Sequence, residues 1–345
     1  MKVLITGNKG YIGSVLVKLL LAKGHNVIGL DTGFFDDCSF YRSTAKIKQI
    51  TKDIRDVAKD DLKDIDAIIH LAALSNDPLS NFDSKLTFAI NYKAAVKLAK
   101  LAKKQKIRRF IFASSQSVYG KIKGSRFVTE NTVTHPLTAY GISKLQAEKE
   151  ILALADNNFC PVSLRPSTVY GISPRLRTDI VLNNLVGWAF TTNEIKLMSD
   201  GTPWRPVIHV EDIGNAFIAA LTAPEELVKG QIFNVGEKES YRVKDMAEMI
   251  KKIIGKCKIT YVENVSTDER SYRINSDKFR KALKDYYKQK WEIKKGIADL
   301  YSNYKRYRLT SKQFGKDRYA RLAHLKRLVL NKKINSRLYW VKNEN

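Results

Sequence analysis

The stretch "KVLITGNKGYIGS" (residues 2–14) decides the predicted fold, because a buried strand, a glycine-rich turn and the start of a helix follow one another in it. The glycines are spaced as GxxGxxG in the turn. Such a turn lets the backbone approach a pyrophosphate, and the N-terminus of the helix favours the negative charge. We therefore predict a dinucleotide site at this turn. Its predicted cofactor contacts are Gly7, Gly10, Tyr11, Ile12 and Gly13.

The next apolar strand, "NVIGLD" (residues 26–31), ends in an acidic residue. A carboxylate at this place in a dinucleotide fold accepts the ribose hydroxyls of the cofactor. It would also repel the 2′-phosphate of NADP. Asp31 therefore predicts NAD as the cofactor.

Farther along the chain, strands and helices alternate. Nearly continuous apolar runs at residues 66–73, 108–115 and 161–166 predict strands, and helical periodicity appears at 85–105 and 139–155. This alternation predicts a parallel sheet that helices cover on both faces. The expected fold class is α/β, a Rossmann-type doubly wound sheet with a smaller, discontinuous α/β lobe.

Three parts are expected from the change of pattern after about residue 170. Residues 1–170 form the dinucleotide-binding domain, to which a later segment at about 205–235 contributes. Residues 171–302 form the second, substrate-binding lobe, and residues 303–345 form a basic C-terminal extension.

Composition limits the class of protein. Hydrophobic content of 44% and charged content of 28% are typical of a soluble globular protein. Three cysteines far apart in the chain show neither metal-ligand nor disulfide spacing, which suits a reducing cytoplasm, and we predict no metal. No apolar run is long enough to span a bilayer. The net charge of +26 is spread along the chain, so we expect no nucleic-acid partner.

The segment "AYGISK" (residues 139–144) places Lys144 four positions after Tyr140 on one face of a predicted helix. Free tyrosine has a pKa near 10 and is a poor base at neutral pH. A neighbouring ammonium group and the positive nicotinamide ring could lower that pKa. The pair is thus a candidate proton acceptor beside a hydride acceptor.

Four motifs in order, GxxGxxG, "HLAA" (70–73), "SSQSVYG" (114–120) and "YGISK" (140–144), resemble those of the extended short-chain dehydrogenase/reductase family. Within it, the chain is similar to the NAD-dependent nucleotide-sugar epimerases and dehydratases over about residues 1–300. The resemblance implies a nucleotide-sugar substrate and a homodimer.

Individual roles follow from the resemblance. Tyr140 would be the base, Lys144 its partner on the nicotinamide ribose, and Ser115 the hydroxyl that bonds the reacting sugar oxygen. Further cofactor contacts would be Asp53, Ile54, Leu71, Ala72, Ala73 and Asn91. Substrate contacts would be Ser115, Ser117, Arg205, Asp268, Arg270 and either Asn183 or Asn184.

The chain also departs from its relatives. The 4,6-dehydratases use an Asp–Glu pair where this chain has Gln116 and Ser117, so dehydration is not expected. Thr168 and Ser75 replace an asparagine and a lysine of the 4-epimerases. The leading prediction is a 4-epimerase acting through a transient 4-keto sugar. A dehydrogenase or 4-keto-reductase with net redox is the alternative, and a non-catalytic NAD- or nucleic-acid-binding relative is a minor one.

The extension at residues 303–345 carries 13 basic and 2 acidic residues. Tyr319, Leu322, Leu325 (or Lys326) and Val329 fall near helical spacing. Such a stripe is expected to pack on the second lobe or on another subunit. Contact with anionic lipid or with a partner is the other interpretation.

Overall fold

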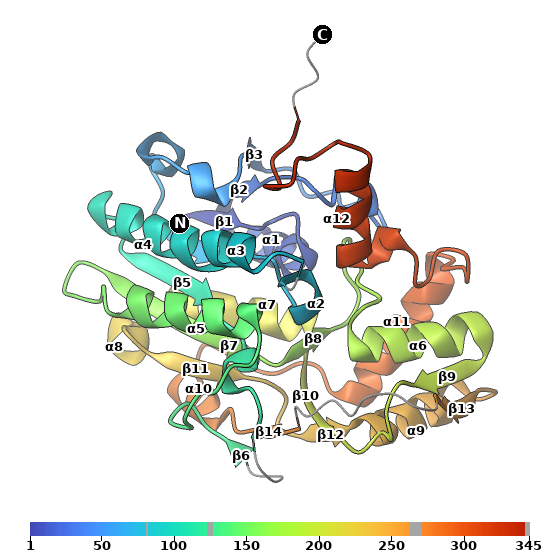
Figure 1. Ribbon diagram of the computed structural model, residues 1–345. Helices are drawn as coiled ribbons and strands as arrows, with labels where there is room; N and C mark the ends of the chain where they lie inside the picture. The colour runs from blue at the N-terminus through green and yellow to red at the C-terminus, as the bar shows by residue number, and fades with distance from the viewer. Residues whose placement is uncertain (81, 123–126, 263–270, 342–345) are drawn as a thin grey trace.

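The computed structural model describes residues 1–80, 82–122, 127–262 and 271–341 (Figure 1). Within these residues, seven parallel strands form one sheet in the order β11-β7-β5-β4-β1-β2-β3. The chain reverses its direction of winding between β1 and β4, as in a doubly wound fold. The strands are β1 (Lys2–Thr6), β2 (Asn26–Asp31), β3 (Lys48–Thr51), β4 (Ala67–His70), β5 (Arg109–Ala113), β7 (Cys160–Pro166) and β11 (Ile232–Val235).

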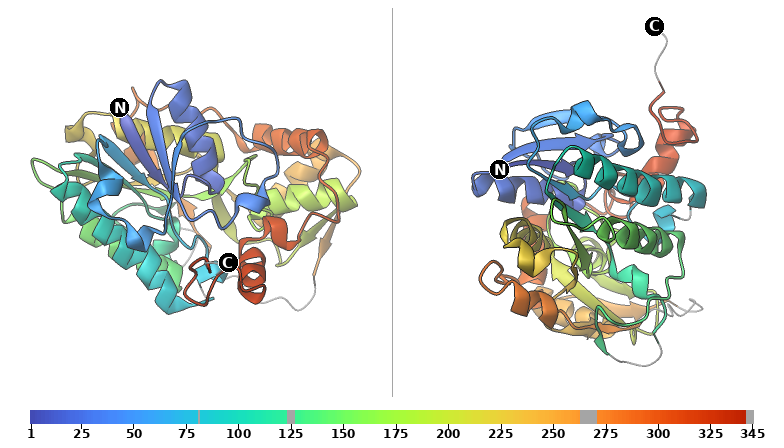
Figure 2. Two further views of the ribbon diagram at one scale, coloured as in Figure 1. Left: turned by 90° about the horizontal axis from the view of Figure 1, so that it is seen from above. Right: turned by 90° about the vertical axis from the view of Figure 1, so that its left-hand side faces the viewer.

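Helices cover both faces of this sheet, which explains why its strands are apolar on both sides. On one face, Val3 and Ile5 of β1 pack with α1 (Tyr11–Ala22) and α7 (Val210–Thr222). On the other face, Leu4 packs with α4 (Ala95–Lys104) and α5 (Ala139–Leu152). Figure 2 shows the two helical layers with the sheet between them. The predicted fold class is confirmed.

A smaller lobe is assembled beside the carboxyl ends of the sheet (Figure 1). One small sheet has the order β12-β10-β8, a second pairs β13 with β9, and a third pairs β14 with β6. Its strands are β6 (Phe127–Val128), β8 (Thr168–Tyr170), β9 (Glu194–Leu197), β10 (Trp204–His209), β12 (Ser240–Arg242), β13 (Lys258–Tyr261) and β14 (Arg273–Ile274). Its main helices are α6 (Val181–Thr192), α9 (Val243–Ile254) and α11 (Ile293–Arg306).

Short helices complete the description. They are α2 (Asp77–Ser80), α3 (Ser84–Thr87), α8 (Glu225–Val228), α10 (Asp277–Ala282) and α12 (Arg321–Leu330), with a π-helical segment, η4 (Phe88–Ala94), leading into α4. Single-turn 3-10 helices are η1 (Asp36–Cys38), η2 (Ile54–Asp56), η3 (Lys59–Leu62), η5 (Gln116–Tyr119) and η6 (Asp317–Tyr319). None of the described helices is both long and apolar enough to cross a membrane.

A buried ion pair fixes α5 to the sheet. Glu148 on α5 binds Arg165 on β7, with 2.5 Å between Oε1 and Nη2, and Ser163 donates to the same carboxylate at 2.7 Å. Removal of one partner from such a pair leaves an uncompensated buried charge. The pair therefore holds the helix that carries Tyr140 and Lys144 in one position.

The C-terminal extension folds back onto the chain itself. Tyr319 packs in the core of the second lobe, as expected, but Leu325 and Leu328 of α12 pack with β2 and α4 in the Rossmann half. Packing on the second lobe is therefore confirmed for Tyr319 and wrong for α12, while contact of the stripe with another subunit stays a prediction. Because Leu325 and Leu328 are buried, they offer no apolar face to lipid.

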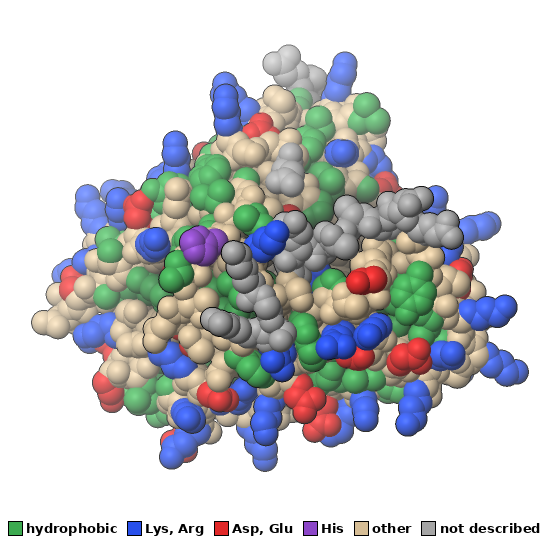
Figure 3. Space-filling model, turned by 60° about the horizontal axis from the view of Figure 1, so that its bottom comes forward, with side chains coloured by type: hydrophobic (Ala, Val, Ile, Leu, Met, Phe, Trp, Pro, Cys, Tyr) green, Lys and Arg blue, Asp and Glu red, His purple; other side chains and the backbone are tan. Residues whose placement is uncertain are grey.

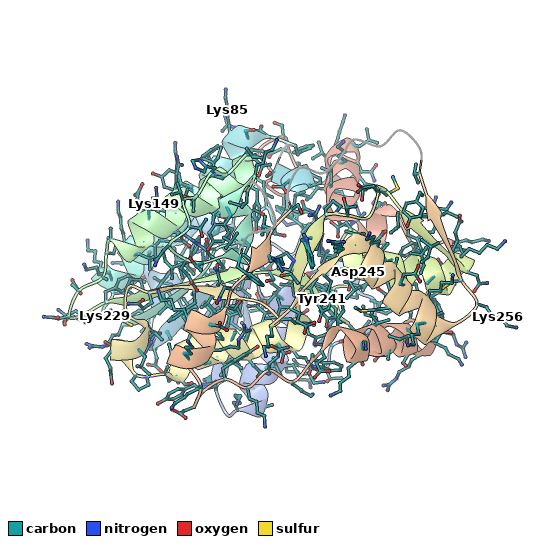
Figure 4. The ribbon with its side chains drawn as sticks, turned by 90° about the horizontal axis from the view of Figure 1, so that it is seen from below. Lys85, Lys149, Lys229, Tyr241, Asp245 and Lys256 are labelled. Atoms are coloured by element: carbon teal, nitrogen blue, oxygen red, sulfur yellow. The ribbon has the colours of Figure 1, made fainter. Side chains whose placement is uncertain are left out.

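Basic side chains are distributed over the surface and mixed with acidic ones on the face that Figure 3 shows. The labelled lysines Lys85, Lys149, Lys229 and Lys256 come from separate elements and lie around the outside of the molecule (Figure 4). On the face shown, the positive charge is therefore spread over the surface, as expected for a general excess of lysine.

Candidate active site

A cavity of about 720 Å³ opens at the carboxyl ends of β1, β4 and β5. This is the crevice in which open α/β sheets bind ligands, because the chain winds away in opposite directions there. The second lobe forms its far wall through β8, β10 and α6, and α12 closes one side. One cavity thus joins the glycine turn to the tyrosine-bearing helix.

The glycine turn is as tight as a dinucleotide site requires. Gly7 has φ +76°, and a Cβ there would lie 2.7 Å from the backbone nitrogen of Ala72. A Cβ on Gly13 would lie 2.2 Å from the carbonyl oxygen of Gly7. Gly10 is the N-cap of α1 and lines the cavity, and no side chain caps the first amides of the helix. Tyr11 and Ile12 also line the cavity.

Asp31 ends β2 on the cavity wall. Its carboxylate accepts hydrogen bonds from the backbone nitrogens of Lys9 at 3.1 Å and Gly33 at 2.9 Å. Burial raises the pKa of this carboxyl, and the two hydrogen bonds act against that rise. The group is held in place beside the glycine turn, where the ribose of a dinucleotide would lie.

One of the two predicted adenine contacts, Asp53, already binds another side chain of the protein. Asp53 and Ile54 line the cavity. However, Arg55 occupies both carboxylate oxygens of Asp53, with distances of 2.8 Å to each. Asp53 would therefore meet adenine as one half of an ion pair.

The segment Leu71, Ala72 and Ala73 follows β4 along the cavity wall, as predicted. Asn91 does not reach the wall. It lies in the π-helical segment, fully buried, where its side chain binds both the nitrogen and the carbonyl of Leu74. Through these two hydrogen bonds Asn91 holds the backbone of Leu74, which lines the cavity.

Ser115 and Tyr140 line the same cavity. Ser115 caps η5 and also accepts from the nitrogen of Ser117 at 3.1 Å. Burial raises the pKa of Tyr140, while Ser115 and the positive charge of Arg177 lower it. The structure thus brings the predicted base and the predicted serine together.

Lys144 lies on the same wall and is 2% exposed. Its ammonium donates to the carbonyl of Ala113 at 2.7 Å, and the Phe112 ring centroid is 4.9 Å away. Burial lowers the pKa of Lys144 to about 7. Near neutral pH the group is poised between its two forms, which suits a residue that responds to a bound ligand.

The wall between the two ends of the cavity contains a cation that sequence reasoning missed. Arg177 binds Asp179 through two hydrogen bonds of 2.9 Å and donates to the carbonyl of Ser75 at 3.2 Å. The positive charge of Arg177 lowers the pKa of Tyr140. The "RLR" spacing at residues 175–177 was visible in the sequence, but nothing local showed which arginine turns inward.

The predicted substrate residues separate into two groups. Ser117, Asn184 and Arg205 line the cavity, whereas Asn183 is buried behind it, donating to the hydroxyl of Tyr11 at 3.0 Å. The structure therefore selects Asn184 as the cavity residue of that pair. Asp268 and Arg270 lie outside the described residues. Trp204 and Tyr272, which were not predicted, line the same end.

Comparison with known proteins identifies the family. The model of the NAD dependent epimerase/dehydratase family matches residues 3–236. The chain belongs to this family. It is 32% identical over 270 residues to YtcB of Bacillus subtilis, named as an uncharacterized UDP-glucose epimerase, covering 74% of this chain and 83% of that protein. It is 29% identical to a UDP-glucose 4-epimerase of Corynebacterium glutamicum, covering 74% and 81%.

Solved structures of family members are also similar. The structure of MoeE5 with UDP-glucuronic acid and NAD has a TM-score of 0.76 and 27% identity, covering 89% of this chain and 99% of that chain. The UDP-glucuronic acid 4-epimerase of Bacillus cereus, also bound to UDP-glucuronic acid and NAD, has a TM-score of 0.75 and 27% identity, with the same coverage. The predictions of an enzyme of this family with NAD as its cofactor are confirmed.

The residues of this epimerase/dehydratase family member fit NAD. The glycine turn leaves no room for a Cβ, which keeps the backbone open to a pyrophosphate. A buried guanidinium nitrogen, Nη1 of Arg321, has no hydrogen-bond partner among the described residues and belongs to the same wall. Gly10, Asp31 and Lys144 would hold the pyrophosphate, the adenosine ribose and the nicotinamide ribose.

Proposed function

We propose that this chain is a 4-epimerase of nucleoside-diphosphate hexoses that keeps its NAD between turnovers. The observation that carries the proposal is that Ser115, Tyr140 and Lys144 line the cavity that also contains the glycine turn. The next residue, Gln116, is buried and donates its amide to the carbonyl of Arg165 at 3.2 Å. An amide cannot supply the acid that elimination of a C6 hydroxyl requires, so the site favours epimerisation.

The residues divide the chemistry among themselves. Tyr140 would accept the proton of the sugar C4 hydroxyl, and Ser115 would stabilise the oxygen as charge develops on it. Lys144 would favour the phenolate when its ammonium is protonated. NAD supplies a hydride acceptor and donor when it is bound. After the 4-keto sugar has turned in the cavity, Tyr140 would return its proton to the oxygen of the opposite epimer.

The substrate class follows from the far end of the cavity and from the relatives. Arg205 lies there beside Trp204, and a guanidinium is suited to a diphosphate. The two structural relatives above are complexes with a UDP-sugar. We therefore propose a UDP-hexose or UDP-hexuronic acid as the substrate.

The purified protein, incubated with UDP-glucose or UDP-glucuronic acid and no added nicotinamide cofactor, tests this proposal. We expect proton NMR to show conversion of one sugar to its 4-epimer, because hydride leaves and returns within one turnover. Formation or consumption of NADH in proportion to the sugar would instead establish a net redox reaction. Absence of conversion with both sugars would contradict the UDP-sugar proposal.

A further inference from the structure

Arg321 is a buried cation at the start of α12, and the described chain pairs it with no carboxylate. Its side chain is 4% exposed and lines the cavity. Nη2 donates to the carbonyl of Arg175 at 3.1 Å, and the guanidinium carbon lies 4.1 Å from the Phe35 ring centroid. A buried charge without a partner is costly, so this position points to a bound anion.

Two other arginines, Arg175 and Arg177, lie near Arg321. Arg175 donates to the carbonyl of Lys9 at 3.2 Å, and Lys9 lies inside the glycine turn. Burial, with the charge of Arg177, lowers the pKa of Arg321 to about 10, and the charge of Asp179 acts against that fall. Arg177 and Arg175 have carboxylate partners, Asp179 and Asp36. Of these three arginines, Arg321 is the one without a carboxylate partner among the described residues, and it lines the cavity that also contains the glycine turn.

The rest of the tail is fastened to the segments that surround an adenosine in this fold. The Trp340 indole donates to the carbonyl of Thr32 at 2.7 Å, directly after Asp31. Arg55, the partner of Asp53, donates to the carbonyl of Arg337 at 2.9 Å. Figure 1 shows the tail crossing from α12 to β2 and β3.

One further contact holds α12 to the same loop. His324 Nε2 donates to the carbonyl of Phe34 at 2.8 Å. Leu322 and Leu325 line the cavity beside Arg321 and place apolar surface over it. The tail therefore covers this end with apolar groups around Arg321, which has no carboxylate partner within the part of the chain that the structure describes.

We propose that residues 317–341 form a clasp over the adenosine-diphosphate end of NAD, in which Arg321 binds the pyrophosphate and the clasp slows release of the cofactor. The apolar wall excludes water, which strengthens the ionic contact. The inference rests on NAD as the cofactor and on no particular reaction. Its failure would therefore leave the epimerase proposal intact, and the reverse also holds.

Equilibrium binding measured by calorimetry tests the ionic contact. Arg321→Gln should weaken NAD binding by about tenfold or more, as expected for loss of one hydrogen bond to a charged group. Lys326→Gln is the matched control, because Lys326 is an exposed cation of the same helix. Adenosine, which has no phosphate, should bind both variants and the wild-type chain equally. Equal NAD affinity of the two variants would overturn the role of Arg321.

A second variant tests the clasp at a residue, Trp340, that does not itself line the cavity. Trp340→Ala removes the contact to Thr32, so NAD should leave the loaded protein several times faster in stopped-flow release. Thermal unfolding of the cofactor-free variants shows whether the fold persists. An unchanged release rate in a folded Trp340→Ala chain would show that the tail does not retain NAD.

Discussion

As the proposed base, Tyr140 would lose a proton in a place that disfavours its anion. Burial raises its pKa, and Ser115 and Arg177 offset only part of that rise. The spacing of "YGISK" predicts that Lys144 lowers this pKa, but in the chain alone its ammonium is bonded to the Ala113 carbonyl and its own pKa is near 7. The missing stabilisation is therefore expected from the positive nicotinamide ring of bound NAD.

Tyr140→Phe should abolish sugar turnover while NAD still binds. The phenyl ring keeps the packing, but the proton acceptor is gone, and loss of such a group costs about 100-fold or more in rate. The NMR conversion assay and an NAD titration on the same sample measure the two effects. A variant that keeps about a tenth of the wild-type rate would contradict the assignment of Tyr140 as the base.

At the scale of elements, the strand–turn–helix unit at residues 2–22 could be predicted because its signals are local. Glycine spacing and apolar periodicity determine it without reference to distant residues. Asn91 and Asn183 could not be assigned in this way, because their partners, Leu74 and Tyr11, come from other elements. Their residue type suited a ligand contact, yet each is used to hold a cavity-lining backbone or side chain.

Gly13→Ala should impair NAD binding by more than about tenfold. The new Cβ would meet backbone atoms, the Gly7 oxygen at 2.2 Å and the Asn8 Cα at 2.7 Å, so the turn itself must move. Gly214→Ala on α7 is the control, because there the Cβ meets the end of the Leu19 side chain at 2.5 Å, which can rotate away. Both changes gain the same helix propensity. Equal NAD affinities in calorimetry would show that the turn tolerates the methyl group.

At the scale of the whole molecule, the two lobes meet around a buried carboxyl group. Glu237 follows β11 of the central sheet, and it accepts a hydrogen bond of 2.7 Å from Tyr170 on β8 of the second lobe. Burial raises the pKa of Glu237 to about 7. The folded chain therefore binds a proton that the unfolded chain releases as the pH rises from about 4.5 to 7.

The stability that Glu237 contributes should fall across this window and be lost above it. In Glu237→Gln the side chain is neutral at every pH. The unfolding free energy of the variant minus that of the wild type should therefore increase by roughly 3 kcal/mol between a pH below 4.5 and a pH above 7. Chemical denaturation at several pH values measures the difference. Glu248→Gln, an exposed change on α9, should show no such trend. A parallel trend in both variants would contradict the buried titration.

The arrangement of the tail is where sequence reasoning reached least far. Helical spacing in residues 319–329 predicts a helix with an apolar face, and α12 is that helix. What it covers depends on the path of the chain after α11, which carries no local signal. In the sequence Arg321 is one of many basic residues, and its burial, which separates it from the exposed Lys326, carries no local signal. The homodimer stays a prediction.

Coverage of one end of the cavity by α12 has a consequence for how such a protein fails. If the proposed keto sugar escaped before the hydride had been returned, the protein would be left holding NADH. An open site would exchange that NADH for NAD from the surroundings within moments. A covered site would keep the NADH, so each escape of the sugar would inactivate one protein molecule for a long time. The fraction of active protein would then fall with the number of such escapes.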